Sequence, residues 1–208
     1  MADTLKDLAL FPLHTVLFPD GLLPLRVFEA RYVDMTRECL RENRPFGVCL
    51  IRQGHEVAVS ARSTEVEAVG CLAHILDCDR EPHGTLLVRS RGGQRMRLLD
   101  RHVQADGLMR GDALLIEADP LVHDIETLSK LAPCAEVLRR IVATLAARDP
   151  DSVPFLAPYR YDDPCWVSNR LAEILPLSPG ARQKMMELEH AGARLELVHQ
   201  YMEKHRLF

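Results

Sequence analysis

The segment from Cys71 to Cys78 holds the residue types best suited to binding a metal ion, two thiols with His74 between them. A zinc site needs about four such ligands that converge tetrahedrally. This segment has the character of a β-strand, on which Cys71 and His74 point to opposite faces, and Cys78 lies distant from both. No second ligand pair with suitable spacing occurs elsewhere, so we predict no metal site here.

Groups that could act in acid–base or nucleophilic catalysis are scattered along the chain. No histidine has an adjacent nucleophile with an obvious third partner. The paired carboxylates, Asp162 with Asp163 and Asp77 with Asp79, lie in turn-like settings where aspartate serves as a cap. The phosphate-binding loop, the dinucleotide fingerprint and the nucleophile elbow are all absent from the sequence. We therefore predict no catalytic residue and no cofactor; a hydrolase that uses a histidine or a cysteine is kept as an alternative.

Four arginines flank Gly92-Gly93 and could contact nucleic acid: Arg89, Arg91, Arg95 and Arg97. The two glycines predict a two-residue hairpin turn, because both can adopt positive φ angles. That register would place two arginines on each face of the hairpin and leave no single basic stripe. The chain also has 26 basic and 30 acidic residues, a net charge of −4, whereas phosphate binding favours a positive excess. RNA binding is therefore an alternative function, and nucleic acid is not the favoured partner.

The elements that would position these groups change in character near residue 120. In the first part, apolar residues in short runs between turn residues predict strands over 8–13, 23–28, 46–51, 57–59, 65–76, 86–91, 94–99 and 107–117. Pro12 predicts that the first strand is an edge strand or ends there. Apolar residues at helical spacing predict one embedded helix over 29–41. Short strands at this spacing are typical of a compact barrel or folded-over sheet.

The second part of the sequence has the pattern of helices. One amphipathic helix is expected from about 128 to 145, with Pro133 near its start or at a kink. Asp163-Pro164 predicts the start of a second helix, since aspartate is a common N-cap residue and proline is common at the first helical position. Ser178-Pro179 predicts the start of a long third helix that runs towards Lys204. Residues 149–162 are expected to form the linking loop.

The cysteines and the hydropathy pattern bear on location. The six cysteines include no C-x-x-C pair, and most lie in apolar stretches, so we expect reduced, buried thiols. No apolar run approaches the ~20 residues that a membrane span needs, and the first residues lack a signal-peptide pattern. We predict a cytoplasmic protein with no membrane partner.

One stretch resembles a known family. Residues 10–32, LFPLHTVLFPDGLLPLRVFEARY, closely resemble the opening of the N-terminal, substrate-binding domain of Lon proteases, including the stand-alone form of that domain in bacteria. Weaker matches follow in order at 47–48, 69–71, 92–97, 170–177 and 184–188. The resemblance therefore extends over nearly the whole chain.

The resemblance implies an α+β fold. A β-rich, PUA-like pseudobarrel with one embedded helix is expected over residues 1–120, and an α-helical bundle over 121–208. It implies a non-catalytic module that binds exposed or unfolded polypeptide segments, as a substrate-recognition or adaptor module, with a protease or a chaperone as a further candidate partner. Ser129 and Lys130 do not match the Ser–Lys dyad of the Lon protease domain, so proteolytic activity is not expected.

The opening motif supplies the candidate peptide-binding residues, several of which are apolar and could line a groove: Phe11, Leu13, Phe18, Leu23, Arg26, Phe28, Arg31 and Tyr32. An alternative is that the aromatic residues fill the barrel core. In that case the charged residues form internal ion pairs or a helix N-terminal interaction.

Overall fold

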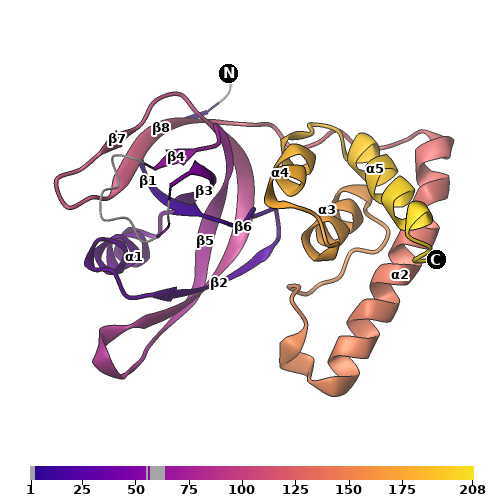
Figure 1. Cartoon of the computed structure of the whole chain (residues 1–208), viewed down its shortest axis with the longest axis horizontal. Coiled ribbons are helices and arrows are strands. Elements are labelled where there is room, and N and C mark those ends of the chain that lie inside the picture. Colours follow the sequence, from indigo (N-terminus) through magenta and orange to yellow (C-terminus); the bar gives the residue numbers. More distant parts are fainter. Residues whose placement is uncertain (1–2, 55, 57–63) are drawn as a thin grey trace. The chain divides into compact units, whose positions relative to one another are not determined.

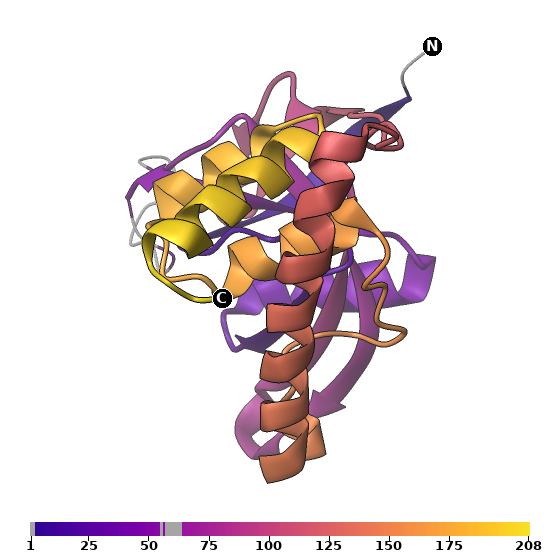
Figure 2. The same cartoon turned by 90° about the vertical axis from the view of Figure 1, so that its right-hand side faces the viewer.

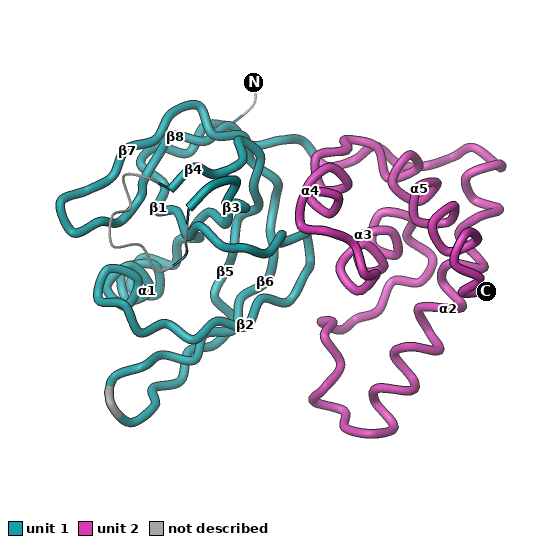
Figure 3. The backbone as a smooth tube through the Cα atoms, viewed as in Figure 1, with its two compact units in different colours: residues 1–117 teal, residues 118–208 magenta. Residues whose placement is uncertain are grey.

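A computed structural model describes residues 3–54, 56 and 64–208 of the chain. The chain forms two compact units, Met1–Glu117 and Ala118–Phe208, drawn in teal and magenta in Figure 3. The strands lie in the first unit, together with one α-helix, and the second unit is helical (Figure 1). This is the α+β class that was predicted.

The first unit is built on one sheet. Its elements are β1 (Thr4–Leu13), β2 (Leu22–Val27), α1 (Ala30–Glu42), β3 (Phe46–Gln53), β4 (Glu65–Val66), β5 (Val69–Arg80), the 3-10 turn η2 (Pro82–Gly84), β6 (Leu86–Leu98), β7 (His102–Val103) and β8 (Met109–Leu115). The strands pair in the order β2-β6-β5-β3-β1-β8-β7, and an additional β6–β8 pairing closes five of them into a barrel. Closure leaves fewer open edges than a flat sheet would have.

Strand β6 corrects the prediction of a hairpin turn at Gly92-Gly93. The glycines lie inside this strand, which pairs with β2 through its first half and with β8 through its last residues. A Cβ atom on Gly92 would lie 2.0 Å from the backbone oxygen of Phe18, so only glycine fits there. The β5–β6 register also shifts between Cys71 and Ala73, which is a bulge. The glycines therefore mark a close approach and a bulge where β6 changes partner.

Other strands also differ from expectation. Strand β1 pairs with β3 and with β8, so it is not an edge strand, but it ends at Leu13, directly after Pro12, as the second of the two predictions for Pro12 stated. Its β8 pairing ends at Leu10, and Pro12 lies beyond it, where the missing N–H breaks no bond to β8. The predicted strand 65–76 is two strands, β4 and β5. The predicted strand 57–59 lies outside the described residues.

Helix α1 agrees with its prediction. It buries Tyr32, Val33, Met35, Thr36 and Cys39, which recur at helical spacing on one face. It ends where Asn43 adopts a left-handed conformation, with φ of 50°. Its buried face joins the larger core cluster of the barrel.

The second unit consists of α2 (Ile125–Arg148), the 3-10 turn η3 (Pro150–Ser152), α3 (Pro164–Ile174), α4 (Pro179–Glu187) and α5 (Ala191–Lys204), seen from another side in Figure 2. The predicted N-caps are confirmed, since Asp163 accepts from the backbone of Cys165 and Trp166, and Ser178 accepts from Ala181. Pro133 lies inside α2.

The predicted long third helix is wrong, because α4 ends at Glu187 and α5 begins at Ala191. The guanidinium of Arg194 explains the break. It donates to the carbonyl oxygens of Met185 (3.4 Å) and Leu188 (3.0 Å), which have lost their helical partners. Residues 188–190, which separate the two helices, include no glycine or proline.

Candidate functional site

The eight residues singled out from the opening motif separate into a buried and an exposed set. Five are core residues, each at most 7% exposed: Phe11, Leu13, Phe18, Leu23 and Tyr32. They can contact a ligand only if the barrel opens. Their burial supports the interpretation that these side chains fill the core of the barrel.

Phe11 shows how tightly this set is packed. Its ring stacks on Tyr32 with centroids 4.0 Å apart and planes 8° apart, and it also meets Phe46 at 6.1 Å. Burial raises the pKa of the Tyr32 hydroxyl to about 12. These rings join β1, β3 and α1 in the core of the barrel.

Arg31 is mostly buried, and its contacts stabilise the fold. Its guanidinium donates to the Glu29 carboxylate (2.7 Å) and to the Gly107 carbonyl oxygen (2.9 Å), and it lies over the Tyr32 ring at 4.6 Å. Only 9% of its side chain is exposed. Arg31 therefore connects the start of α1 to the loop between β7 and β8.

Arg26 and Phe28 are the accessible members of the set. The Phe28 side chain follows β2 and is 63% exposed, which is unusual for a large aromatic residue. Arg26 is also exposed and pairs with Glu81 at 2.9 Å. Both residues belong to the segment from β2 to α1.

Strand β2 offers backbone groups as well as side chains. Within the described residues, β2 pairs with β6 and with no other strand. The hydrogen bond from Gly92 N to Gly21 O fixes the alternation, so the backbone groups of Leu22, Pro24 and Arg26 point away from β6. Pro24 carries no N–H, so this edge presents two donors, one at each side of the proline.

The arginines near Gly92-Gly93 do not form a basic stripe. Arg89 pairs with Asp77 at 3.1 Å, and Arg91 donates through Nε to Asp20 at 2.9 Å. Arg95 is 4% exposed and donates to the carbonyl oxygen of Glu117 at 3.5 Å. Carboxylates and carbonyls within the chain thus occupy groups that an RNA phosphate would need.

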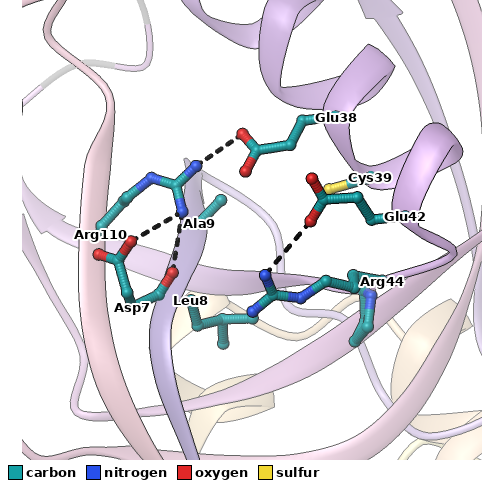
Figure 4. Close-up of a pocket in the computed structure, with 9 residues that line it drawn as sticks. Asp7, Leu8, Ala9, Glu38, Cys39, Glu42, Arg44 and Arg110 are labelled. Carbon is teal, nitrogen blue, oxygen red and sulfur yellow. Dashed lines mark hydrogen bonds and ion pairs between the residues drawn. The ribbon is translucent and has the colours of Figure 1, made fainter.

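A cleft lined by several charged side chains lies between β1 and α1 and includes Arg110 from β8 (Figure 4). Arg110 donates to the carboxylates of Asp7 (3.1 Å) and Glu38 (2.7 Å), and Arg44 reaches Glu42. The free volume is about 20 Å³, enough for roughly one water molecule. The cleft is therefore held closed by ion pairs between its own side chains and is too small to be a substrate pocket.

The thiols are poorly suited to nucleophilic chemistry. Burial raises the pKa of Cys39 to about 11, and of Cys49 and Cys134 to about 12, so all three are protonated at neutral pH. None of the six cysteines, all of which the structure describes, forms a disulfide. Cys71 is buried and His74 exposed, as expected for opposite faces of a strand. In the described part of the chain, no three metal-ligating side chains gather into a site.

Sequence reasoning missed the backbone edge of β2, because a strand's position in a sheet depends on long-range pairing. Pro24 was the available signal, since proline within a sheet favours edge positions.

Within the residues that the structure describes, no helix is long and apolar enough to cross a bilayer.

Comparison with known proteins gives the same assignment over almost the entire chain. The family model of the ATP-dependent protease La (LON) substrate-binding domain matches residues 7–204. Lon protease of Xanthomonas oryzae pv. oryzae is 24% identical over 193 residues, which cover 92% of this chain and 22% of the relative. Lon protease 2 of Herpetosiphon aurantiacus is 29% identical, over 93% of this chain and 23% of the relative. The chain thus spans about a quarter of the length of these relatives.

Two solved structures share the fold. The Lon N-terminal domain protein from Xanthomonas campestris superposes with a TM-score of 0.72 and 34% identity, covering 93% of this chain and 97% of that one. The N-terminal domain of Mycobacterium avium complex Lon protease superposes with a TM-score of 0.64 and 16% identity, covering 96% of this chain and 100% of that one.

Proposed function

Because the chain belongs to the ATP-dependent protease La (LON) substrate-binding domain family, we propose that it is a non-catalytic module that binds exposed or unfolded polypeptide segments. It acts by recognition, as a substrate-binding or adaptor module that presents captured segments to a protease or a chaperone. Its cysteines, which form no disulfide in the described residues, suit a reducing compartment, and we propose the cytoplasm as its location.

The observation that carries the proposal is the exposed Phe28 beside the open edge of β2. An extended peptide can add to a strand edge through backbone hydrogen bonds, which do not depend on its sequence. Leu22 and Arg26 each offer an N–H group there. An apolar side chain of the peptide packs on the Phe28 ring. The site therefore recognises an unfolded backbone together with an apolar side chain.

The size of this contact sets the expected affinity. Full burial of a phenylalanine side chain contributes about 1.5–3 kcal/mol, and association has its own entropic cost. A single exposed ring and two backbone donors supply less than the roughly 8 kcal/mol that micromolar binding requires, so one such contact binds in about the millimolar range or more weakly. Weak binding of many sequences is what a substrate-recognition module requires.

A peptide array tests the proposal. Extended peptides with leucine, phenylalanine or valine should bind the protein, and peptides of equal charge with serine at those positions should not. The Phe28→Ser variant should bind these peptides more weakly than the wild-type chain. Leu99→Ser is the matched control, because Leu99 is 56% exposed and follows the other end of β6. Equal binding of apolar and serine peptides would remove the proposal.

Salt dependence distinguishes peptide binding from the alternative of RNA binding. Apolar peptide binding should change little between 50 and 200 mM salt. Phosphate contacts weaken steeply over the same range, by about 10³–10⁵ for a protein that makes 6–10 of them. Binding of single-stranded RNA that is lost in this way would favour the alternative.

A further inference from the structure

The second unit contains an open apolar groove far larger than the cleft beside Arg110. Its volume is about 450 Å³, within the range of roughly 300–1,000 Å³ that is typical of ligand pockets. Its apolar lining comes from α2, from α3 with the residue that follows it, and from the end of the sequence: Val137, Ile141, Leu145, Leu171, Leu175 and Leu207. Polar groups enter only from α2, with Arg140 and Thr144.

The helical periodicity of α2 explains why an apolar face is left open. Val137, Ile141 and Leu145 recur every four residues and lie one above another on the helix. Val137 is buried, whereas Ile141 and Leu145 are half-buried, although they lie on the same side. The stripe is therefore covered at one end and open towards the C-terminus of the helix.

One leucine of the chain itself already lies on this groove. Leu207 lines it, and the Leu207 carbonyl oxygen accepts from Arg140 Nη2 at 3.5 Å. The groove therefore binds a leucine side chain and the backbone carbonyl of the same residue. This pair of contacts shows which chemistry the groove accepts.

The contact is shallow. Leu207 is 39% exposed, and Phe208 is 48% exposed although its ring lies 5.0 Å from that of His199. The segment turns at Arg206, whose φ of 54° is in the left-handed region, and it is held by the bond from Leu207 N to Met202 O at 3.0 Å. A non-glycine residue in this conformation carries strain, so displacement of the segment releases some of it.

We propose that this groove is a second polypeptide-binding site, which takes a bulky aliphatic side chain from an extended segment while Arg140 donates to that segment's backbone carbonyl. Leu207 is its resident occupant, and an incoming segment displaces it. The proposal rests on the proposed function only in that the ligand is an exposed polypeptide segment. Its residues belong to the second unit, whereas Phe28 and β2 belong to the first.

Charge and shape favour this ligand. An acidic side chain at the centre of the groove would lie on the apolar side chains and be desolvated there, with Arg140 at the rim as the one charged group of the lining. A leucine buries its branched end against α2 and α3, and its carbonyl uses the donor at the rim. We therefore expect leucine, isoleucine and phenylalanine to be preferred at the central position and aspartate to be rejected.

A labelled ten-residue peptide, GSGRLFGSGS, provides the direct probe, with GSGRSSGSGS as its control. Fluorescence anisotropy should give saturable binding of the first peptide to the full chain. Replacing the resident occupant, in the variant L207S/F208S, should lower the Kd about tenfold if the groove is free in roughly a tenth of wild-type molecules. Ile141→Gln and Arg140→Gln should weaken binding, and Leu197→Gln, at a leucine on α5 that is 44% exposed, should not.

Amide chemical-shift mapping of the wild-type chain keeps the test independent of variant folding. The peptide should shift the amides of Arg140, Ile141, Thr144 and Leu207, and Phe28→Ser should leave this binding unchanged. No shift at these positions, or no gain in affinity for L207S/F208S, would overturn the groove proposal and leave the site at Phe28 untouched. Weaker array binding in Phe28→Ser, together with unchanged amide shifts in the groove, would support both sites.

Discussion

The substitution Phe11→Ala distinguishes most clearly between a core residue and a peptide-binding residue. The Phe11 side chain is 7% exposed and stacked at 4.0 Å on Tyr32, so its removal leaves a cavity among rings that cannot easily collapse. Phenylalanine-to-alanine changes in cores cost about 3–5 kcal/mol, and aromatic pairing contributes about 0.5–1.5 kcal/mol beyond buried area. We expect a loss of about 4 kcal/mol in the free energy of unfolding of the first unit.

Native-state hydrogen exchange measures this loss where it occurs. Amides of β1 and β3 lie in the pairing next to Phe11 and should exchange through global opening of the first unit. Their opening free energy should fall by the same 3–5 kcal/mol in Phe11→Ala. Amides of α2 should change by much less if the two units open separately.

The binding assay supplies the contrast. The folded fraction of Phe11→Ala should bind apolar peptides with the wild-type Kd, because the ring is not accessible. Phe28→Ser should show the reverse, with wild-type exchange rates and a Kd raised by an order of magnitude or more. If Phe11→Ala weakened binding while its opening free energy changed by less than about 1 kcal/mol, Phe11 would be a contact residue and our reading would be wrong.

Three further predictions concern stability and thiol chemistry. Asp119→Ala should cost about 3–5 kcal/mol in urea titrations followed by the fluorescence of the single tryptophan, because it leaves Arg194 buried at 2% exposure without its paired carboxylate; a loss below 1 kcal/mol would contradict this. Gly92→Ala should lower the free energy of unfolding by at least about 1–3 kcal/mol, since its methyl group would overlap a backbone oxygen. Gly180→Ala should be neutral or stabilising, because a Cβ there meets nothing within 4 Å. Equal melting temperatures of the two variants would refute this prediction. Cys49 should resist a thiol reagent at pH 8, because burial raises its pKa to about 12. The free energy of unfolding should fall as pH rises above about 9, because thiols ionise there in the unfolded chain and the native Cys49 thiol does not. Rapid labelling of the native protein would count against this.

The change from strands to helices was predictable from the sequence, because local periodicity and caps decide it. The N-caps at Asp163 and Ser178 and the buried stripe of α1 follow from neighbouring residues alone. The opening motif also indicated the family correctly. Each of these signals lies within one element or one contiguous segment.

The errors share one physical cause, dependence on distant residues. Gly92-Gly93 has the composition of a hairpin turn, but the pairing of β6 with β5 places it inside a strand, and the approach of the Phe18 backbone requires glycine at position 92. The break between α4 and α5 depends on Arg194 capping carbonyls of the preceding helix. Phe11 and Phe28 have the same residue type, and the packing of the barrel decides which of them is accessible.

The most direct test of polypeptide recognition is an anisotropy titration of the wild-type chain with one fluorescent protein in two states. A reduced and carboxymethylated protein stays unfolded, and its native form is the control. We predict saturable, weakly salt-dependent binding of the unfolded form and none of the folded form. Equal binding of both forms, or no binding of either, would contradict the proposed function.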